Sequence, residues 1–169
     1  MFMSIESFIT TWEMEGSSTQ KILDALTDES LQQAVKPNDR TLGGIAWHLV
    51  TAIGSIVGET GLSFDAPGRN TTLPTSAKEI ADAYRSASVS LLNAIKENWT
   101  DQSLFVEHKM FGQFDAPAGI ALTILVNHQI HHRGQMTILM RQADLVVPGM
   151  YGPAKEEWSL IGMEPPEIK

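Results

Sequence analysis

Hydrophobic residues recur at helical spacing in four separate stretches of the chain, with polar residues between them. The stretches cover about 5–26, 42–58, 77–99 and 115–142. Ser4 and Thr41 stand where N-caps of the first two helices belong, and Ser76 with Glu79 forms a capping box before the third. Pro117 falls in the first turn of the fourth, where its missing N–H costs little. The pattern therefore predicts four amphipathic helices.

The segments between these helices carry turn residues and little periodicity. Leu62–Thr75 reads as a loop, and 104–110 can be extended, although too few other strands are expected to form a sheet. Pro165 and Pro166 prevent the end of the chain from being helical throughout. We therefore predict an all-α fold: a four-helix bundle with an irregular C-terminal tail, in one domain over 1–169. The long connections favour a topology with a crossover.

Composition narrows the classes of function. The chain has 169 residues, no cysteine and a formal net charge of -8. The missing cysteines exclude disulfides, thiolate zinc sites and a cysteine nucleophile. The acidic balance argues against a nucleic-acid partner. Neither a signal peptide nor a run of about 20 apolar residues is apparent, so we expect a cytoplasmic protein with no membrane partner.

Candidate chemistry is concentrated in Asn127–Gln135, which holds three of the five histidines. His128 and His132 are four residues apart, so they lie on one helix face and can reach the same metal ion. A lone buried histidine is more often a hydrogen-bonded core residue, but two side by side are costly to bury without a metal. Gln129 stands where the HExxH motif requires glutamate, which disfavours the zinc-protease mechanism.

His48 is the natural third ligand, because it lies on the apolar stripe of the second helix. Three imidazoles on Zn²⁺, Ni²⁺ or Fe²⁺ leave positions open for water or substrate, as a catalytic metal requires. His131 competes for the ligand role, but His132 continues the inward stripe better. His108 lies in a connector and is expected to be exposed.

These residues resemble the DinB-like (YfiT-like) superfamily of metalloenzymes. The resemblance rests on His48 within 42–48, on Asn127-His128-x-x-x-His132-Arg133-Gly134-Gln135, and on 147–153. It implies a four-helix bundle in up-down-down-up order, a divalent metal held by His48, His128 and His132, and a homodimer. Relatives include thiol S-transferases and thiol-dependent isomerases. The resemblance thus implies a small-molecule substrate and a low-molecular-weight thiol cosubstrate. A thiol that is bound to a metal ion loses its proton.

Other readings of the same chain stay open. One is a non-catalytic, metal-binding stress-response bundle, and another is a metal-dependent hydrolase.

Arg133 can pair with an acid on a neighbouring helix, which we favour, or anchor a substrate carboxylate. We expect Gln135 to bond a neighbouring helix and Gly134 to permit close helix packing. We expect three aromatic residues to lie in the core or in the wall of a pocket: Trp12, Trp47 and Tyr84. Three other residues could each form a hydrogen bond with the second ring nitrogen of a histidine ligand, and the sequence does not favour any one of them: Asn38, Asp39 and Glu59.

Overall fold

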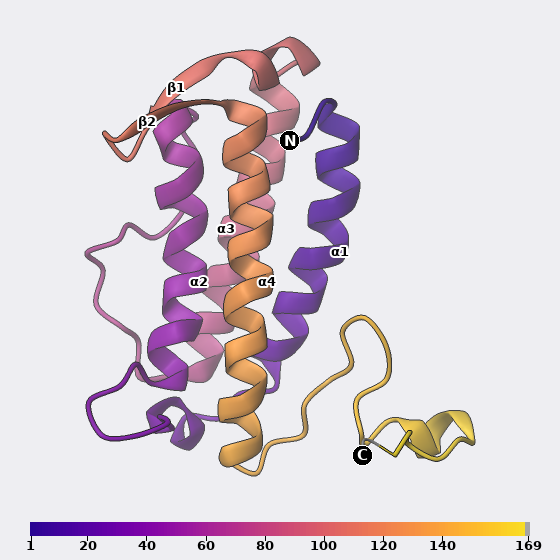
Figure 1. Ribbon diagram of the computed structural model, residues 1–169. Coiled ribbons are helices and arrows are strands. Elements are labelled where there is room, and N and C mark those ends of the chain that lie inside the picture. Colours follow the sequence, from indigo (N-terminus) through magenta and orange to yellow (C-terminus); the bar gives the residue numbers. More distant parts are fainter. Residues whose placement is uncertain (168–169) are drawn as a thin grey trace.

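Four long helices lie side by side in the computed structural model, which describes residues 1–167 (Figure 1). They are α1 (Ile5–Asp24), α2 (Leu42–Val57), α3 (Ala77–Asn98) and α4 (Ala118–Gln142). The side-chain oxygens of Ser4, Thr41 and Ser76 accept hydrogen bonds from backbone N–H groups in the first turns of α1, α2 and α3. The three predicted N-caps are therefore confirmed, because local sequence is enough to satisfy a helix start.

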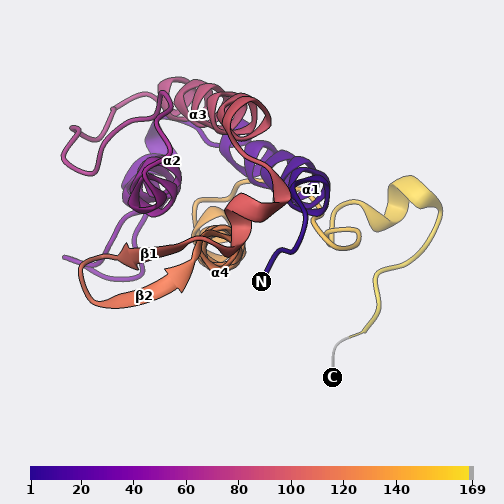
Figure 2. The same ribbon diagram turned by 90° about the horizontal axis from the view of Figure 1, so that it is seen from above.

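The helices form a ring around one apolar core. α2 packs against α3 and α4, and α1 packs against the same two helices, as the view along the helices shows (Figure 2). Trp12 and Tyr84 are fully buried in this core. Trp47 is half-buried, and its indole N–H donates to the carbonyl oxygen of Thr71, 3.2 Å away. The apolar stripes read from the sequence thus face inward.

A small antiparallel hairpin corrects the prediction that no sheet forms. Strands β1 (Glu107–Met110) and β2 (Phe114–Pro117) pair with each other and so need no third strand. Phe111 and Gly112, in the turn between them, both have positive φ, which is uncommon for phenylalanine. Residues 115–117 therefore belong to a strand, and Pro117 is the N-cap of α4, which begins three residues later than predicted.

The connection between α2 and α3 spans the length of the helices. The short 3₁₀ helix η2 (Gly58–Thr60), which follows α2, contacts β1 at the hairpin end. The first residue of α3, Ala77, donates its N–H to Asp28 in the connection that precedes α2. Residues 61–76 therefore return the chain to the opposite end of the molecule (Figure 1). This explains why the loop is too long for a simple helix hairpin.

The predicted irregular tail leaves the helices after α4. It contains one short 3₁₀ helix, η4 (Trp158–Ile161), and projects from the body of the protein (Figure 1). Two further 3₁₀ helices lie in connections, η1 (Glu29–Gln32) before α2 and η3 (Asp101–Phe105) before the hairpin.

One helical stretch within residues 1–167, Leu42–Thr60, is long and apolar enough to cross a membrane by length and composition. Of its most apolar window, 61% is buried inside the protein, as expected for a core helix. The apolar character of α2 is thus explained by its position between α3 and α4.

Two glycines in α4 are expected to respond oppositely to alanine. A Cβ atom on Gly119 would stand 2.5 Å from the Phe2 carbonyl oxygen, whereas one on Gly134 would meet nothing within 4 Å. Gly134 therefore does not permit close helix packing, contrary to the sequence-based prediction. We expect Gly119→Ala to destabilise by about 1–3 kcal/mol through overpacking. Gly134→Ala should stabilise by about 0.5–1 kcal/mol through helix propensity.

Urea unfolding of both variants beside the parent protein measures the two effects. Equal free-energy changes in the two variants would contradict the assignment of Gly119 to a close backbone contact.

Candidate metal centre

Three histidines from two helices meet at one point between α2 and α4. Candidate donor nitrogens of His48, His128 and His132 all lie within 4.8 Å of one another. The Nε2 atoms of His48 and His128 are 3.0 Å apart, and the three ring centroids are 4.4–4.8 Å apart. The structure thus brings together the three residues predicted as ligands, although they are separated by up to 84 positions in the chain.

The two helices are joined at the level of this cluster by Gln129. Its side-chain amide donates to the carbonyl oxygen of Leu49, 3.1 Å away, and the side chain is completely buried. Leu49 directly follows His48, so this bond fixes α2 against α4 beside the histidines. The sequence showed only that Gln129 is not the glutamate of a protease motif. Its structural role required knowing that α2 and α4 are neighbours.

The imidazoles are held in their neutral form. Burial, followed by the effect of His132, lowers the pKa of both His48 and His128 to about 4. Burial also lowers the pKa of His132, although its bond to Gln135 opposes this. At neutral pH the rings are therefore uncharged, which is the form of histidine that binds a metal.

Gln135 fixes the orientation of His132. The Gln135 side-chain oxygen lies 2.7 Å from Nδ1 of His132. Because this oxygen only accepts hydrogen bonds, Nδ1 carries the proton and Nε2 keeps its lone pair. Gln135 thus bonds its own helix and not a neighbouring one, which corrects the prediction.

Asn38, Asp39 and Glu59 are not hydrogen-bonded to the clustered histidines. In residues 1–167, the side-chain hydrogen bonds of these rings are formed with each other and with Gln135. The Glu59 carboxylate instead accepts from the backbone N–H of Phe111. The other ring nitrogen of His128, Nδ1, is buried without a hydrogen-bond partner among the described groups. His132 is therefore the ring with a side-chain partner outside the cluster.

Replacing Gln135 with leucine is expected to weaken Zn²⁺ binding by about 10- to 100-fold, the usual cost of losing such an outer partner. Competition with a chromogenic chelator measures the affinity, with exposed Gln102→Leu as the control. Unchanged affinity in Gln135→Leu would show that packing alone orients His132.

The donor set fits a divalent transition metal with open positions. Two nitrogen ligands on tetrahedral Zn²⁺ stand about 3.3 Å apart, close to the separation of the His48 and His128 Nε2 atoms. Among the described residues, no carboxylate joins the group. Imidazole suits zinc, nickel and iron alike. Three protein ligands leave room for water or a small molecule.

His131 and His108 lie outside the cluster. The His131 ring is 4.8 Å from that of His132, but its side chain is exposed and it is not part of the group. His108 is in strand β1 at the end of the molecule. That these two residues are not ligands stays a prediction.

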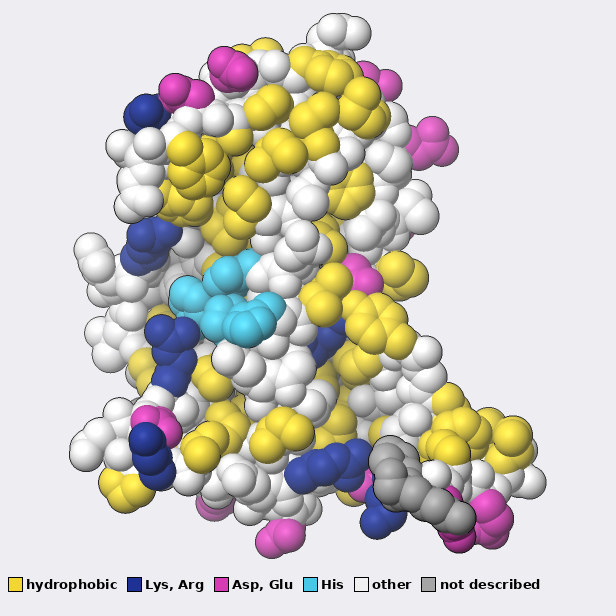
Figure 3. Space-filling view, in the orientation of Figure 1, with side chains coloured by type: hydrophobic (Ala, Val, Ile, Leu, Met, Phe, Trp, Pro, Cys, Tyr) yellow, Lys and Arg dark blue, Asp and Glu magenta, His cyan; other side chains and the backbone are white. Residues whose placement is uncertain are grey.

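A cavity of about 420 Å³ opens beside His132. Its wall is formed by residues from η1–α2 and from α4: Val35, Asp39, Arg40, Ile45, His132, Gln135, Ile138 and Leu139. On the surface, the histidines form one exposed patch with Lys or Arg side chains close to it (Figure 3). A molecule in this cavity would therefore contact one of the candidate ligands directly.

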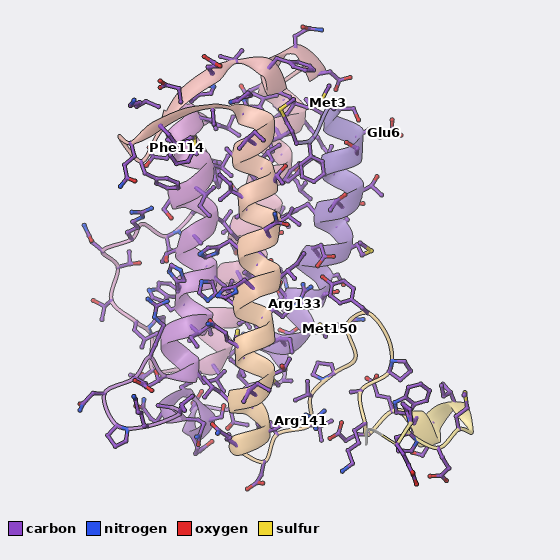
Figure 4. All side chains as sticks on the ribbon, viewed as in Figure 1. Met3, Glu6, Phe114, Arg133, Arg141 and Met150 are labelled. Carbon is purple, nitrogen blue, oxygen red and sulfur yellow. The ribbon has the colours of Figure 1, made fainter. Side chains whose placement is uncertain are left out.

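Arg133 belongs to a different network on the other side of α4. Its guanidinium donates to the Glu15 carboxylate at 2.6 Å, to the Glu15 carbonyl and to the hydroxyls of Thr19 and Tyr151. Figure 4 shows Arg133 on the side of α4 that faces α1. The favoured reading, that Arg133 pairs with an acid on a neighbouring helix, is confirmed.

Known proteins are similar to this chain over most of its length. A family model described as "DinB family" matches residues 1–167. "Uncharacterized protein YrdA" of Bacillus subtilis (strain 168) is 51% identical over 168 residues, covering 99% of this chain and 100% of that protein. The crystal structure of a DinB-like protein from Bacillus cereus ATCC 10987 matches with 50% identity and a TM-score of 0.86, covering 89% of this chain and 100% of the other.

A more distant solved structure has the same fold. The DinB-like protein YjoA from Bacillus subtilis matches with a TM-score of 0.68 at 13% identity, covering 88% of this chain and 99% of the other. The arrangement of elements is thus shared at low sequence similarity.

Proposed function

The chain belongs to the DinB family, and we propose that it binds one divalent transition metal through His48, His128 and His132. The observation that carries this proposal is the convergence of three neutral imidazoles within 4.8 Å. We further propose that the fold is a four-helix bundle in up-down-down-up order, in one domain over 1–169, and that the protein is a cytoplasmic homodimer.

The open coordination positions favour an enzyme that acts on a small molecule. A bound divalent metal would lower the pKa of a low-molecular-weight thiol and so supply a thiolate nucleophile to a chain that has no cysteine of its own. Gln135 holds the His132 ring with Nε2 free, and the cavity beside His132 receives the rest of the bound molecule. We therefore propose a metal-dependent thiol S-transferase.

Metal analysis of protein purified without a histidine tag tests the centre. After loading with Zn²⁺, Ni²⁺ or Fe²⁺ and gel filtration, we expect about one equivalent per chain. A value below ~0.2 equivalent for all three metals would refute the metal centre.

Transfer is tested separately with the metal-loaded protein, N-acetylcysteine and an electrophilic aromatic acceptor. Consumption of thiol that depends on the metal supports the transferase. Metal-linked thermal stabilisation without any turnover would instead support the non-catalytic, metal-binding stress-response protein.

A further inference from the structure

The cavity beside His132 has one basic side chain in its wall, that of Arg40. We infer that this cavity binds a small amphipathic anion, with an apolar body against the cavity wall and a carboxylate or similar group on Arg40. The inference rests on the proposed function in one respect: the reacting end of the bound anion would lie at the metal beside His132. It adds the chemical class of the molecule bound there.

Arg40 differs from most arginines of this protein in having no acidic partner. Arg85, Arg133 and Arg141 each form an ion pair with a carboxylate. In residues 1–167, Arg40 and Arg69 have no carboxylate oxygen within 4.0 Å, although the chain has 20 acidic residues and 12 basic ones. Acids are therefore abundant, and these two guanidinium groups remain available to an anion from outside the chain.

The Arg40 side chain lies against the start of α2. A Cβ atom on Gly44 would stand 3.3 Å from Arg40 Cγ, so the stem of this exposed side chain lies beside the first turn of α2. Arg40 shares the cavity wall with His132, one of the candidate ligands. Arg69 lies instead over the Phe111 ring and is not part of this cavity wall. Arg40 is thus the unpaired arginine that lines the cavity.

Asp39 also lines the cavity and is the group that opposes an anion. Its carboxylate forms no ion pair with Arg40 within 4.0 Å, so it does not neutralise the guanidinium by direct contact. Arg40 therefore offers an unpaired positive charge at the cavity, in a protein whose net charge is -8. Because the net negative charge of the protein repels anions in general, attraction of an anion to this cavity depends on Arg40.

Apart from His132 and Gln135, the rest of the wall is apolar. Ile45 and Leu139 are buried and form the inner part, while Val35 and Ile138 are exposed at the edge. A volume of about 420 Å³ is at the small end of the range for ligand sites, ~300–1,000 Å³. The apolar body is therefore smaller than a typical drug, and a short alkyl or single aromatic group fills it.

Hexanoate and hexanamide form a matched pair of probes, because they differ only in the charged group. Binding to the metal-free protein is followed by NMR titration. We expect hexanoate to bind roughly fivefold tighter than hexanamide, as suits one exposed charge pair. Arg40→Gln should abolish the preference, whereas Arg85→Gln, which removes the same charge from α3, should leave it intact. Equal binding of both probes to the parent protein, or an unchanged preference in Arg40→Gln, would overturn the inference.

Repeating the titration with Zn²⁺-loaded protein separates this inference from the proposed function. If Zn²⁺ does not bind but Arg40→Gln still abolishes the preference for hexanoate, the anion site stands and the metal centre fails. If one equivalent of Zn²⁺ binds but the parent protein shows no preference, the metal centre stands and the anion site fails.

Discussion

Replacing His128 with alanine is expected to abolish stoichiometric metal binding. The substitution removes one of three donors and leaves two rings on different helices. Loss of a partner outside the ligand set costs about 10- to 100-fold in affinity, so loss of a ligand should cost more than about 100-fold. Metal content after gel filtration should therefore fall from about one equivalent to near zero.

His48→Ala and His132→Ala should give the same result, since each supplies one of the three nitrogens. His131→Ala and His108→Ala are the matched controls, because each removes an imidazole that lies outside the group. If His131→Ala lost the metal while His132→Ala retained it, the rival pairing of His128 with His131 would be correct.

Thermal stability provides a second measurement that does not depend on any enzymatic activity. A ligand that binds only the folded state at 100 times its Kd stabilises that state by about 2.7 kcal/mol. Zn²⁺ should therefore raise the Tm of the parent and of His131→Ala, and leave that of His128→Ala unchanged. Equal Tm increases in all three proteins would place the Zn²⁺ elsewhere.

The starts of α1, α2 and α3 were predictable because their determinants are local. A serine or threonine before an apolar stripe satisfies backbone donors two or three residues later, whatever the rest of the chain does. The hairpin was not predictable in this way. Its strands have only four residues each, and its turn places Phe111 at a φ of 51°, which an aromatic residue rarely adopts. Pairing between the strands decides the structure there.

The histidine cluster was predictable in part for a similar reason. His128 and His132 are neighbours on any helix, and His48 lies on an inward stripe. The surroundings depended on distances that sequence does not give. The orientation of Gln135 toward His132, and the open space around Gly134, follow from which helix faces which. The cavity at Arg40 likewise requires α2 and α4 to be adjacent.

Replacing Arg133 with methionine is expected to destabilise the protein by about 3–5 kcal/mol, the usual cost of leaving a buried charge unpaired. The side chains of Arg133 and Glu15 are only 2% and 5% exposed, and they are 2.6 Å apart. Without Arg133, the Glu15 carboxylate keeps, among residues 1–167, only the hydroxyl of Tyr151 as a side-chain partner. For a protein of this size, the loss corresponds to a Tm lower by roughly 6–20 °C.

A double variant tests whether the cost comes from the orphaned charge. Glu15→Met with Arg133→Met replaces both charged groups by apolar side chains, and should recover most of the lost stability. Arg85→Met is the control for an exposed pair, where the expected loss is about 0–1 kcal/mol. Because Arg133 faces α1 and not the histidines, folded Arg133→Met should still bind about one equivalent of Zn²⁺. Unchanged stability together with lost turnover would instead identify Arg133 as a substrate anchor, because a buried structural ion pair cannot be broken without a cost in folding.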